Sequence, residues 1–253
     1  ITASAGTSNF RAGVNAGNSI ESGGNYNVVI GDEAGTAITT GDSNVAIGYA
    51  ALDANTTADN NTAVGYAALG ANTTGASNVS IGRNAMLVNT TGDQNVALGT
   101  SALAANTEGD QNVALGINAM IANIDGDNNV AVGALSLDAN TTADNNTAVG
   151  YGTLTTNTTG ASNVAVGKSA LGANTTADSN TAVGYQSMLA NTTGANNVAV
   201  GTSALDANTT ASNNIAIGTS ALGAVTTAPS NVAIGSDAGK LMVTGTGQNV
   251  LIG

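Results

Sequence analysis

Aspartates that recur at one position of a repeating sequence are the side chains most able to do chemistry in this chain. Four of them follow one another at a constant interval: Asp93, Asp110, Asp127 and Asp144. If one coil of chain advances the structure by one strand spacing, these carboxylates stack about 4.8 Å apart. Together with Glu108, Asp125, Asn side chains and backbone carbonyls they could bind a cation, and Ca²⁺ suits such oxygen ligands best. A solvated acidic stripe without a ligand is the simpler interpretation, and the sequence favours it.

Threonine pairs recur with the same period, and they suggest an alternative function of another class. The pairs include Thr56-Thr57, Thr73-Thr74, Thr90-Thr91 and Thr141-Thr142. A regular Thr array on a β-solenoid resembles the ice-binding face of antifreeze proteins. However, neighbouring strand residues point to opposite faces, and a Gly often follows the pair, so the hydroxyls are expected mainly to cap backbone groups in a turn. The preceding Asn completes an N-glycosylation pattern, but periodic ladder chemistry explains this Asn equally well.

The residue inventory makes catalysis an unexpected function. The chain of 253 residues contains no His and no Cys, and its net charge is −12 with only four basic residues, Arg11, Arg83, Lys168 and Lys240. The common general bases and nucleophilic dyads are therefore missing, and no basic cluster can hold a phosphate or an oxyanion. The negative charge also argues against nucleic acid and anionic membranes as partners, and no apolar run is long enough to insert into a bilayer. We expect no enzyme activity and no cofactor other than the Ca²⁺ considered above.

A 17-residue repeat positions all of these side chains. Its consensus is N-V-A-I-G-Y-x-A-L-x-A-N-T-T-G-D-N, and we number its positions one to seventeen from the leading Asn. Thirteen complete copies begin at Asn27, Asn44, Asn61, Asn78, Asn95, Asn112, Asn129, Asn146, Asn163, Asn180, Asn197, Asn214 and Asn231, and a truncated copy begins at Asn249. Such a short period is typical of a solenoid. We therefore predict a repeat solenoid over residues 27–247, an N-terminal cap or junction over residues 1–26, and the start of a further coil over residues 248–253.

The spacing within one copy predicts an all-β fold, a parallel β-solenoid of about thirteen coils. Val45 and Ile47 alternate with Ala46, which is the two-residue period of a strand. Leu52 and Ala54 suggest a second short strand at about positions nine to thirteen, so that each coil has two strands and two turns. The Val, Ile and Leu columns are expected to form the apolar spine. The Ala column at position three lies opposite, where it would let another copy of the chain approach closely.

Two columns never vary in residue type, and they are expected to hold successive coils together. At position one, side-chain amides are expected to form a buried or turn-capping ladder that includes Asn44, Asn61, Asn78 and Asn95. At position five, glycines are expected to take the positive φ angles of a turn, including Gly48, Gly65, Gly82 and Gly99.

The NVAIG unit and the YxALxANTTG segment that follows it also carry a family resemblance. Residues 180–194, NTAVGYQSMLANTTG, are a clear example. This pattern resembles the repeats of bacteriophage tail-fibre-like proteins and, more distantly, the head repeats of YadA-type trimeric autotransporter adhesins, and it covers residues 27–253. The resemblance implies a left-handed β-roll, a homotrimer, and an extracellular fibre at a cell or virion surface that attaches to a host or matrix component. The adhesin repeat is usually shorter than the repeat of this chain, so the extra residues are expected to enlarge a turn.

Overall fold

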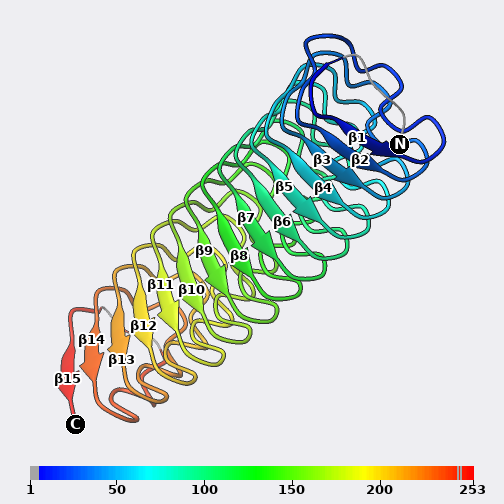
Figure 1. Cartoon of the computed structure of the whole chain (residues 1–253). Coiled ribbons are helices and arrows are strands. Elements are labelled where there is room, and N and C mark those ends of the chain that lie inside the picture. Colours follow the sequence, from blue (N-terminus) through cyan, green and yellow to red (C-terminus); the bar gives the residue numbers. More distant parts are fainter. Residues whose placement is uncertain (1–5, 244, 246) are drawn as a thin grey trace. The chain divides into compact units, whose positions relative to one another are not determined.

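The computed structural model describes residues 6–243, 245 and 247–253. The chain divides into two compact units, unit 1 (Ile1–Asn128) and unit 2 (Asn129–Gly253), and each is a β-solenoid whose strands lie side by side (Figure 1). The strands of unit 1 are β1 (Phe10–Ala12), β2 (Val28–Ile30), β3 (Val45–Ile47), β4 (Thr62–Val64), β5 (Val79–Ile81), β6 (Val96–Leu98) and β7 (Val113–Leu115). Those of unit 2 are β8 (Val130–Val132), β9 (Thr147–Val149), β10 (Val164–Val166), β11 (Thr181–Val183), β12 (Val198–Val200), β13 (Ile215–Ile217), β14 (Val232–Ile234) and β15 (Val250–Ile252).

Within each unit, every strand pairs in parallel with the strand of the next coil. Val45 lies opposite Thr62 and Ala46 opposite Ala63, so equivalent positions of the repeat are neighbours. This register confirms the predicted parallel solenoid of 17-residue coils. The segment predicted as a cap also contributes a strand, because Phe10 of β1 pairs with Val28, a spacing one residue longer than the repeat. The last pairing, between β14 and β15, has the same longer spacing.

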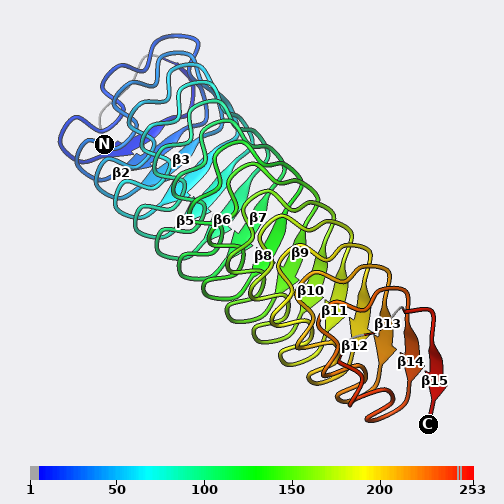
Figure 2. The same cartoon turned by 180° about the vertical axis from the view of Figure 1, so that it is seen from behind.

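The predicted second strand is wrong. Each coil has a single strand of three residues at positions two to four, and positions six to eleven form turns. Figure 2, seen from behind, shows loops where a second sheet would lie. The backbone explains why: Ala50 has a φ of 49° and Leu52 a φ of 54°. These left-handed residues interrupt an extended chain, so positions nine to thirteen cannot be a strand.

The predicted apolar spine is also wrong, because the strands face the opposite way. Ala97, Ala102 and Leu103, at positions three, eight and nine, are fully buried, whereas Leu98 at position four is 48% exposed. The apolar interior of most coils therefore consists of two columns that are mainly Ala and one Leu or Met column. A coil with one short strand has a narrow interior, in which only a small side chain such as Ala or Ser fits between the strand and the Leu or Met side chain. The small volume of this interior decides which face of the strand points inward, although Val and Ile are more hydrophobic than Ala.

The first and last complete copies have Gly at position nine, and other residues fill the space that Leu occupies elsewhere. A Cβ atom on Gly35 would lie 2.8 Å from Cδ1 of Ile38, which is fully buried at position twelve. A Cβ atom on Gly239 would lie 2.7 Å from Cδ1 of Leu251, which stands at position three in place of Ala. The terminal coils thus keep the interior volume while changing which positions supply it, a type of exchange that cores tolerate well.

Candidate functional site

The Asn column at position one links each coil to the next from inside the solenoid. Oδ1 of Asn78 accepts the backbone N–H of Asn95 at 2.9 Å, and Nδ2 of Asn78 donates to the carbonyl of Gly92 at 2.8 Å. The structure places the four predicted ladder residues, Asn44, Asn61, Asn78 and Asn95, in this same arrangement, and all four are fully buried. The ladder therefore runs from side chain to backbone, and it satisfies polar groups that water cannot reach.

The Gly column at position five allows the coils to stack closely. The predicted residues Gly48, Gly65, Gly82 and Gly99 have φ angles between 129° and 140°. A Cβ atom on Gly99 would lie 2.5 Å from the carbonyl oxygen of Gly116 in the next coil. A side chain is therefore excluded both by the backbone conformation and by the neighbouring coil.

A second Asn ladder runs at position twelve, where the sequence left ladder chemistry open beside N-glycosylation. Nδ2 of Asn72 donates to Oδ1 of Asn55 at 3.0 Å and to the carbonyl of Gly75 at 2.8 Å. The signal was available, since Asn occupies position twelve in ten successive copies from Asn55 to Asn208. Asn55 is fully buried, so in the folded chain its amide is not accessible for glycosylation.

The aspartates at position sixteen cap backbone groups of the preceding coil. In unit 1, Oδ1 of Asp93 accepts the N–H of Ala76 at 2.6 Å, and Oδ1 of Asp110 accepts the N–H of Asp93 at 2.7 Å. Asp127 accepts the N–H of Asp110 in the same way, whereas Asp144 belongs to unit 2. At the same position, the hydroxyl of Ser212 accepts the N–H of Ala195 at 3.0 Å. An uncharged residue can therefore take this role, and the column has a structural explanation that needs no ion.

The described part of the chain holds no group of three or more Asp, Glu, His or Cys residues that could bind a metal ion. The aspartates of position sixteen supply one carboxylate per coil, and this carboxylate already accepts a backbone hydrogen bond. Ca²⁺ binding therefore stays a prediction that the geometry does not favour, since Ca²⁺ usually takes six to eight oxygen ligands.

Two aspartates at position ten are half-buried, and their protonation is affected by the fold. Loss of solvent raises the pKa of Asp53 above its ordinary value of 3.8, and the neighbouring Glu33 raises it further, while backbone hydrogen bonds act in the opposite direction. Loss of solvent likewise raises the pKa of Asp206. In both cases the folded state holds the carboxyl proton more tightly than the unfolded chain does.

We expect the Asp53→Asn variant to be slightly more stable than the wild type at neutral pH. The partly buried carboxylate of Asp53 destabilises the folded state, and the raised pKa reflects this. The destabilisation is absent below the ordinary pKa of 3.8, grows as the pH rises, and is complete above the raised pKa. The gain should be less than about 1 kcal/mol because solvent screens a half-buried charge. Thermal unfolding at pH 3 and pH 7 measures it. The exposed Asp125→Asn variant is the control, and an equal gain in both variants would contradict the role of burial.

The threonines of positions thirteen and fourteen differ in their roles. At position thirteen, the hydroxyl of Thr73 donates to the carbonyl of Thr90 at 3.0 Å, and the hydroxyl of Thr90 donates to the carbonyl of Thr107 at the same distance. At position fourteen, the side chains of Thr74 and Thr91 are exposed. One hydroxyl of each pair thus joins neighbouring coils. Ice binding was expected to use both Thr columns. The hydroxyls of position thirteen are already hydrogen-bonded to the next coil, so only the Thr column at position fourteen is available.

The side chains at positions two and four of the strands point outward, and they form an apolar surface along each unit. We call this surface the outer strand face. It carries Val, Ile or Leu in every copy from residue 27 onward, except for three Thr residues at position two, and it carries no charge. Ile217 is 39% exposed and Ile234 is 41% exposed. A contiguous apolar surface of this kind usually marks an interaction site.

Tyrosines and basic residues border the outer strand face at position six. In unit 1 the exposed rings of Tyr49 and Tyr66 stack with centroids 5.4 Å apart and an interplanar angle of 16°. In unit 2 Nζ of Lys168 lies 6.0 Å from the ring centroid of Tyr151. Column six therefore offers varied, exposed side chains next to a uniform apolar surface.

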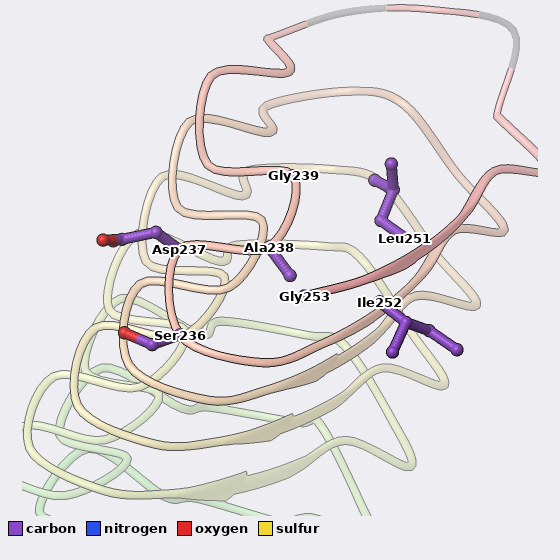
Figure 3. Close-up of a pocket in the computed structure, with 7 residues that line it drawn as sticks. All are labelled: Ser236, Asp237, Ala238, Gly239, Leu251, Ile252 and Gly253. Carbon is purple, nitrogen blue, oxygen red and sulfur yellow. The ribbon is translucent and has the colours of Figure 1, made fainter.

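The C-terminal end of unit 2 contains a hollow of about 290 Å³. Figure 3 shows that it lies at the open end of the last coil, where its lining residues are Ser236, Asp237, Ala238, Gly239, Leu251, Ile252 and Gly253. In that view the carboxyl group of Asp237 and the hydroxyl group of Ser236 point away from the chain end at Gly253. The hollow brings no polar side chains together, so it offers no catalytic arrangement.

No helix among the described residues could cross a membrane. Comparisons with family models, with curated proteins and with solved structures gave no match to this chain. The solenoid and its surface columns are therefore the observations on which a functional proposal rests.

Proposed function

We propose that this chain is a structural and adhesive segment of a surface fibre, in which copies associate through the outer strand face. The apolar, uncharged character of that face is the observation that carries the proposal. The chain has a net charge of −12, so two copies repel each other over most of their surfaces. The outer strand face carries no charged residue, and there a second copy can approach at the lowest electrostatic cost.

The size of the face is adequate for stable association. Two partly exposed aliphatic side chains per coil offer roughly 100 Å² of apolar surface. Summed over a unit, this area exceeds the largest apolar patch of a typical soluble monomer, which is about 300–600 Å². Seven or eight coils offer on the order of 800 Å², about the area that each partner buries in a stable complex. The face also repeats once per coil, so a second face with the same repeat can match it along its length.

The association that we propose differs from the sequence-based expectation in the surface that it uses. The Ala column at position three was expected to receive another copy, but it is buried, as Ala97 illustrates. The resemblance to fibre and adhesin repeats supports three copies, an extracellular cell-surface or virion location, and attachment to a host or matrix component. In such an assembly the variable column at position six stays at the border of the interface, where it can contact an external partner.

Replacing both Ile217 and Ile234 with Asp is expected to convert the assembly to single chains. Each substitution would place a charge within the buried apolar interface, in β13 or β14, which costs several kcal/mol per unpaired ion. Sedimentation equilibrium measures the mass: about three times 24.2 kDa for the wild type and about 24.2 kDa for the variant. Circular dichroism should show that the variant keeps its β-structure, because both side chains point outward.

The matched control carries the same change at exposed apolar residues away from the face. Val88 and Ile124 are 37% and 46% exposed and lie at positions eleven and thirteen, so the double Asp variant at these sites should keep the wild-type mass. A wild-type mass of one chain at micromolar concentration would overturn the proposed function.

A further inference from the structure

We infer that Tyr49 and Tyr66 form a site of oxidative modification, at which a peroxide-driven one-electron oxidation couples the two rings into dityrosine and so links two coils of unit 1 covalently. Of the five tyrosines of the chain, only these two occupy the same position in successive copies of the repeat. Their rings stack with centroids 5.4 Å apart and an interplanar angle of 16°. The inference concerns one chain, and it does not depend on the self-association proposed above.

The backbone holds the two tyrosines side by side, while their rings stay mobile and accessible. The N–H group of Ala67 donates to the carbonyl of Tyr49 at 2.9 Å, and Ile47 lies opposite Val64 in the paired strands that come before the tyrosines. The two side chains therefore start about 4.8 Å apart, one strand spacing. They are 52% and 54% exposed, so an oxidant can reach them and the rings can change rotamer quickly. Two ring carbons can thus meet without any movement of the coils.

The coupling reaction needs a peroxide as oxidant and no other group from the protein. Each phenol gives up one electron and one proton, and one molecule of hydrogen peroxide, acting through a haem peroxidase, takes up both pairs and becomes two molecules of water. The two phenoxyl radicals then form one carbon–carbon bond between the ring carbons next to their hydroxyl-bearing carbons. The hydrogen atom on each of these carbons moves to the phenolic oxygen, which restores both aromatic rings. The product has lost two hydrogen atoms in total.

The residue inventory of the chain favours coupling over competing reactions. The chain contains no Cys and no Trp, the side chains that most readily give an electron to a tyrosyl radical. Three of the four methionines, Met86, Met120 and Met188, are fully buried and compete little for the oxidant. A radical on one ring therefore persists until the other ring is oxidised. Because no disulfide can form in this chain, dityrosine is a covalent link between coils that its side chains do allow.

Unit 2 arranges its tyrosines differently, and it provides an internal comparison. Tyr151 and Tyr185 also stand at position six and are exposed, but Lys168 occupies the coil between them. Nζ of Lys168 lies 6.0 Å from the ring centroid of Tyr151. Two strand spacings separate the two tyrosines, about 9.6 Å. They are thus as accessible as the pair in unit 1 but too far apart to couple, so accessibility alone does not make a coupling site.

Oxidation of the full chain with hydrogen peroxide and a haem peroxidase, at low protein concentration, tests the inference. A protease that cleaves at aspartate separates Tyr49 from Tyr66, because Asp53 and Asp59 lie between them. The wild type should show dityrosine fluorescence and a linked pair of peptides that is lighter by two hydrogen atoms than the sum of the two. The Tyr66→Phe variant should lose this pair and most of the fluorescence. The matched control, Tyr151→Phe, should keep both at the wild-type level.

A gain of coupling in unit 2 tests the spacing itself. The Lys168→Tyr variant places three tyrosines in successive coils, and it should form an additional link from residue 168 to Tyr151 or to Tyr185. Oxidised wild-type chains whose tyrosines are consumed without the link between Tyr49 and Tyr66 would overturn the inference. An equally frequent link between Tyr151 and Tyr185 would do the same, and so would a link that occurs only in products that migrate as two chains on a denaturing gel.

Discussion

Replacing Gly150 with Ala should strongly destabilise unit 2, while the same change two residues later, at Gly152, should have almost no effect. Gly150 is a position-five glycine with a φ of 139°, and an added Cβ atom would lie 2.7 Å from the carbonyl oxygen of Gly167. The new methyl group would have to push the next coil away. Gly152 has a φ of 58°, and nothing lies within 4 Å of its added Cβ atom.

The expected sizes of the two effects differ widely. At Gly150 the backbone strain of a non-glycine residue costs about 1–3 kcal/mol and the steric overlap a similar amount. The midpoint of thermal unfolding should fall by about 10 °C. At Gly152 the change in the free energy of unfolding should stay within about 1 kcal/mol. Ala lowers the conformational entropy of the unfolded chain, and this stabilisation roughly offsets the strain of Ala at a left-handed φ. Other copies already hold such residues there, including Ala50 and Ser169 at φ angles of 49° and 57°. Similar midpoints for the two variants would contradict the close stacking of the Gly column.

Residues that never vary could be assigned correctly from the sequence. Asn at position one and Gly at position five occur in every copy, and stacking places identical residues above one another, so a ladder and a tight turn follow directly. The pairing of Val45 with Thr62 shows the register that this argument requires. The 17-residue period therefore contains enough information to predict the parallel solenoid.

The direction in which the strands face could not be obtained from alternation alone. Alternation divides Val45 and Ile47 from Ala46, but it does not indicate which set is inside. Hydrophobicity favours Val and Ile, and this gave the wrong choice. The answer depends on the width of the coil, which in turn depends on the turn at positions six to eleven. That turn has a left-handed Leu52, a conformation that the Leu residue type does not predict.

The candidate site follows from this corrected orientation. With Val and Ile outside, the apolar face becomes the surface that needs a partner, and Thr62 becomes a polar residue within it. In the sequence, the aspartates of position sixteen were the side chains most able to do chemistry. The hydrogen bond from Ala76 to Asp93 gives it a structural role instead. Side-chain to backbone bonds between coils depend on how each coil is folded, so the sequence period alone could not reveal them.

The buried ladder can be tested by one chemical change made at two adjacent residues, Asn60 and Asn61. Asn61 is fully buried; its Nδ2 donates to the carbonyl of Gly75 at 2.8 Å, and its Oδ1 accepts the N–H of Asn78 at 2.9 Å. Asn60 is exposed, and its φ of 60° is one that Asp also tolerates. The Asn61→Asp variant keeps the acceptor but replaces the donor with a carboxylate oxygen that faces the Gly75 carbonyl. The two variants have the same charge and nearly the same shape.

At neutral pH, Asn61→Asp should lose about 3–5 kcal/mol, because it buries an unpaired charge. Asn60→Asp should change stability by less than about 0.5 kcal/mol. Burial would raise the pKa of the new carboxyl at residue 61, so its destabilising effect should be complete above that raised pKa and should shrink as the pH falls toward its ordinary range. Once protonated, the carboxyl can again donate to Gly75. Urea unfolding followed by circular dichroism at pH 4 and pH 7 measures this recovery. A loss at residue 61 that does not depend on pH would mean that the ladder is maintained by shape alone, and a loss as large at residue 60 would place that side chain inside the fold as well.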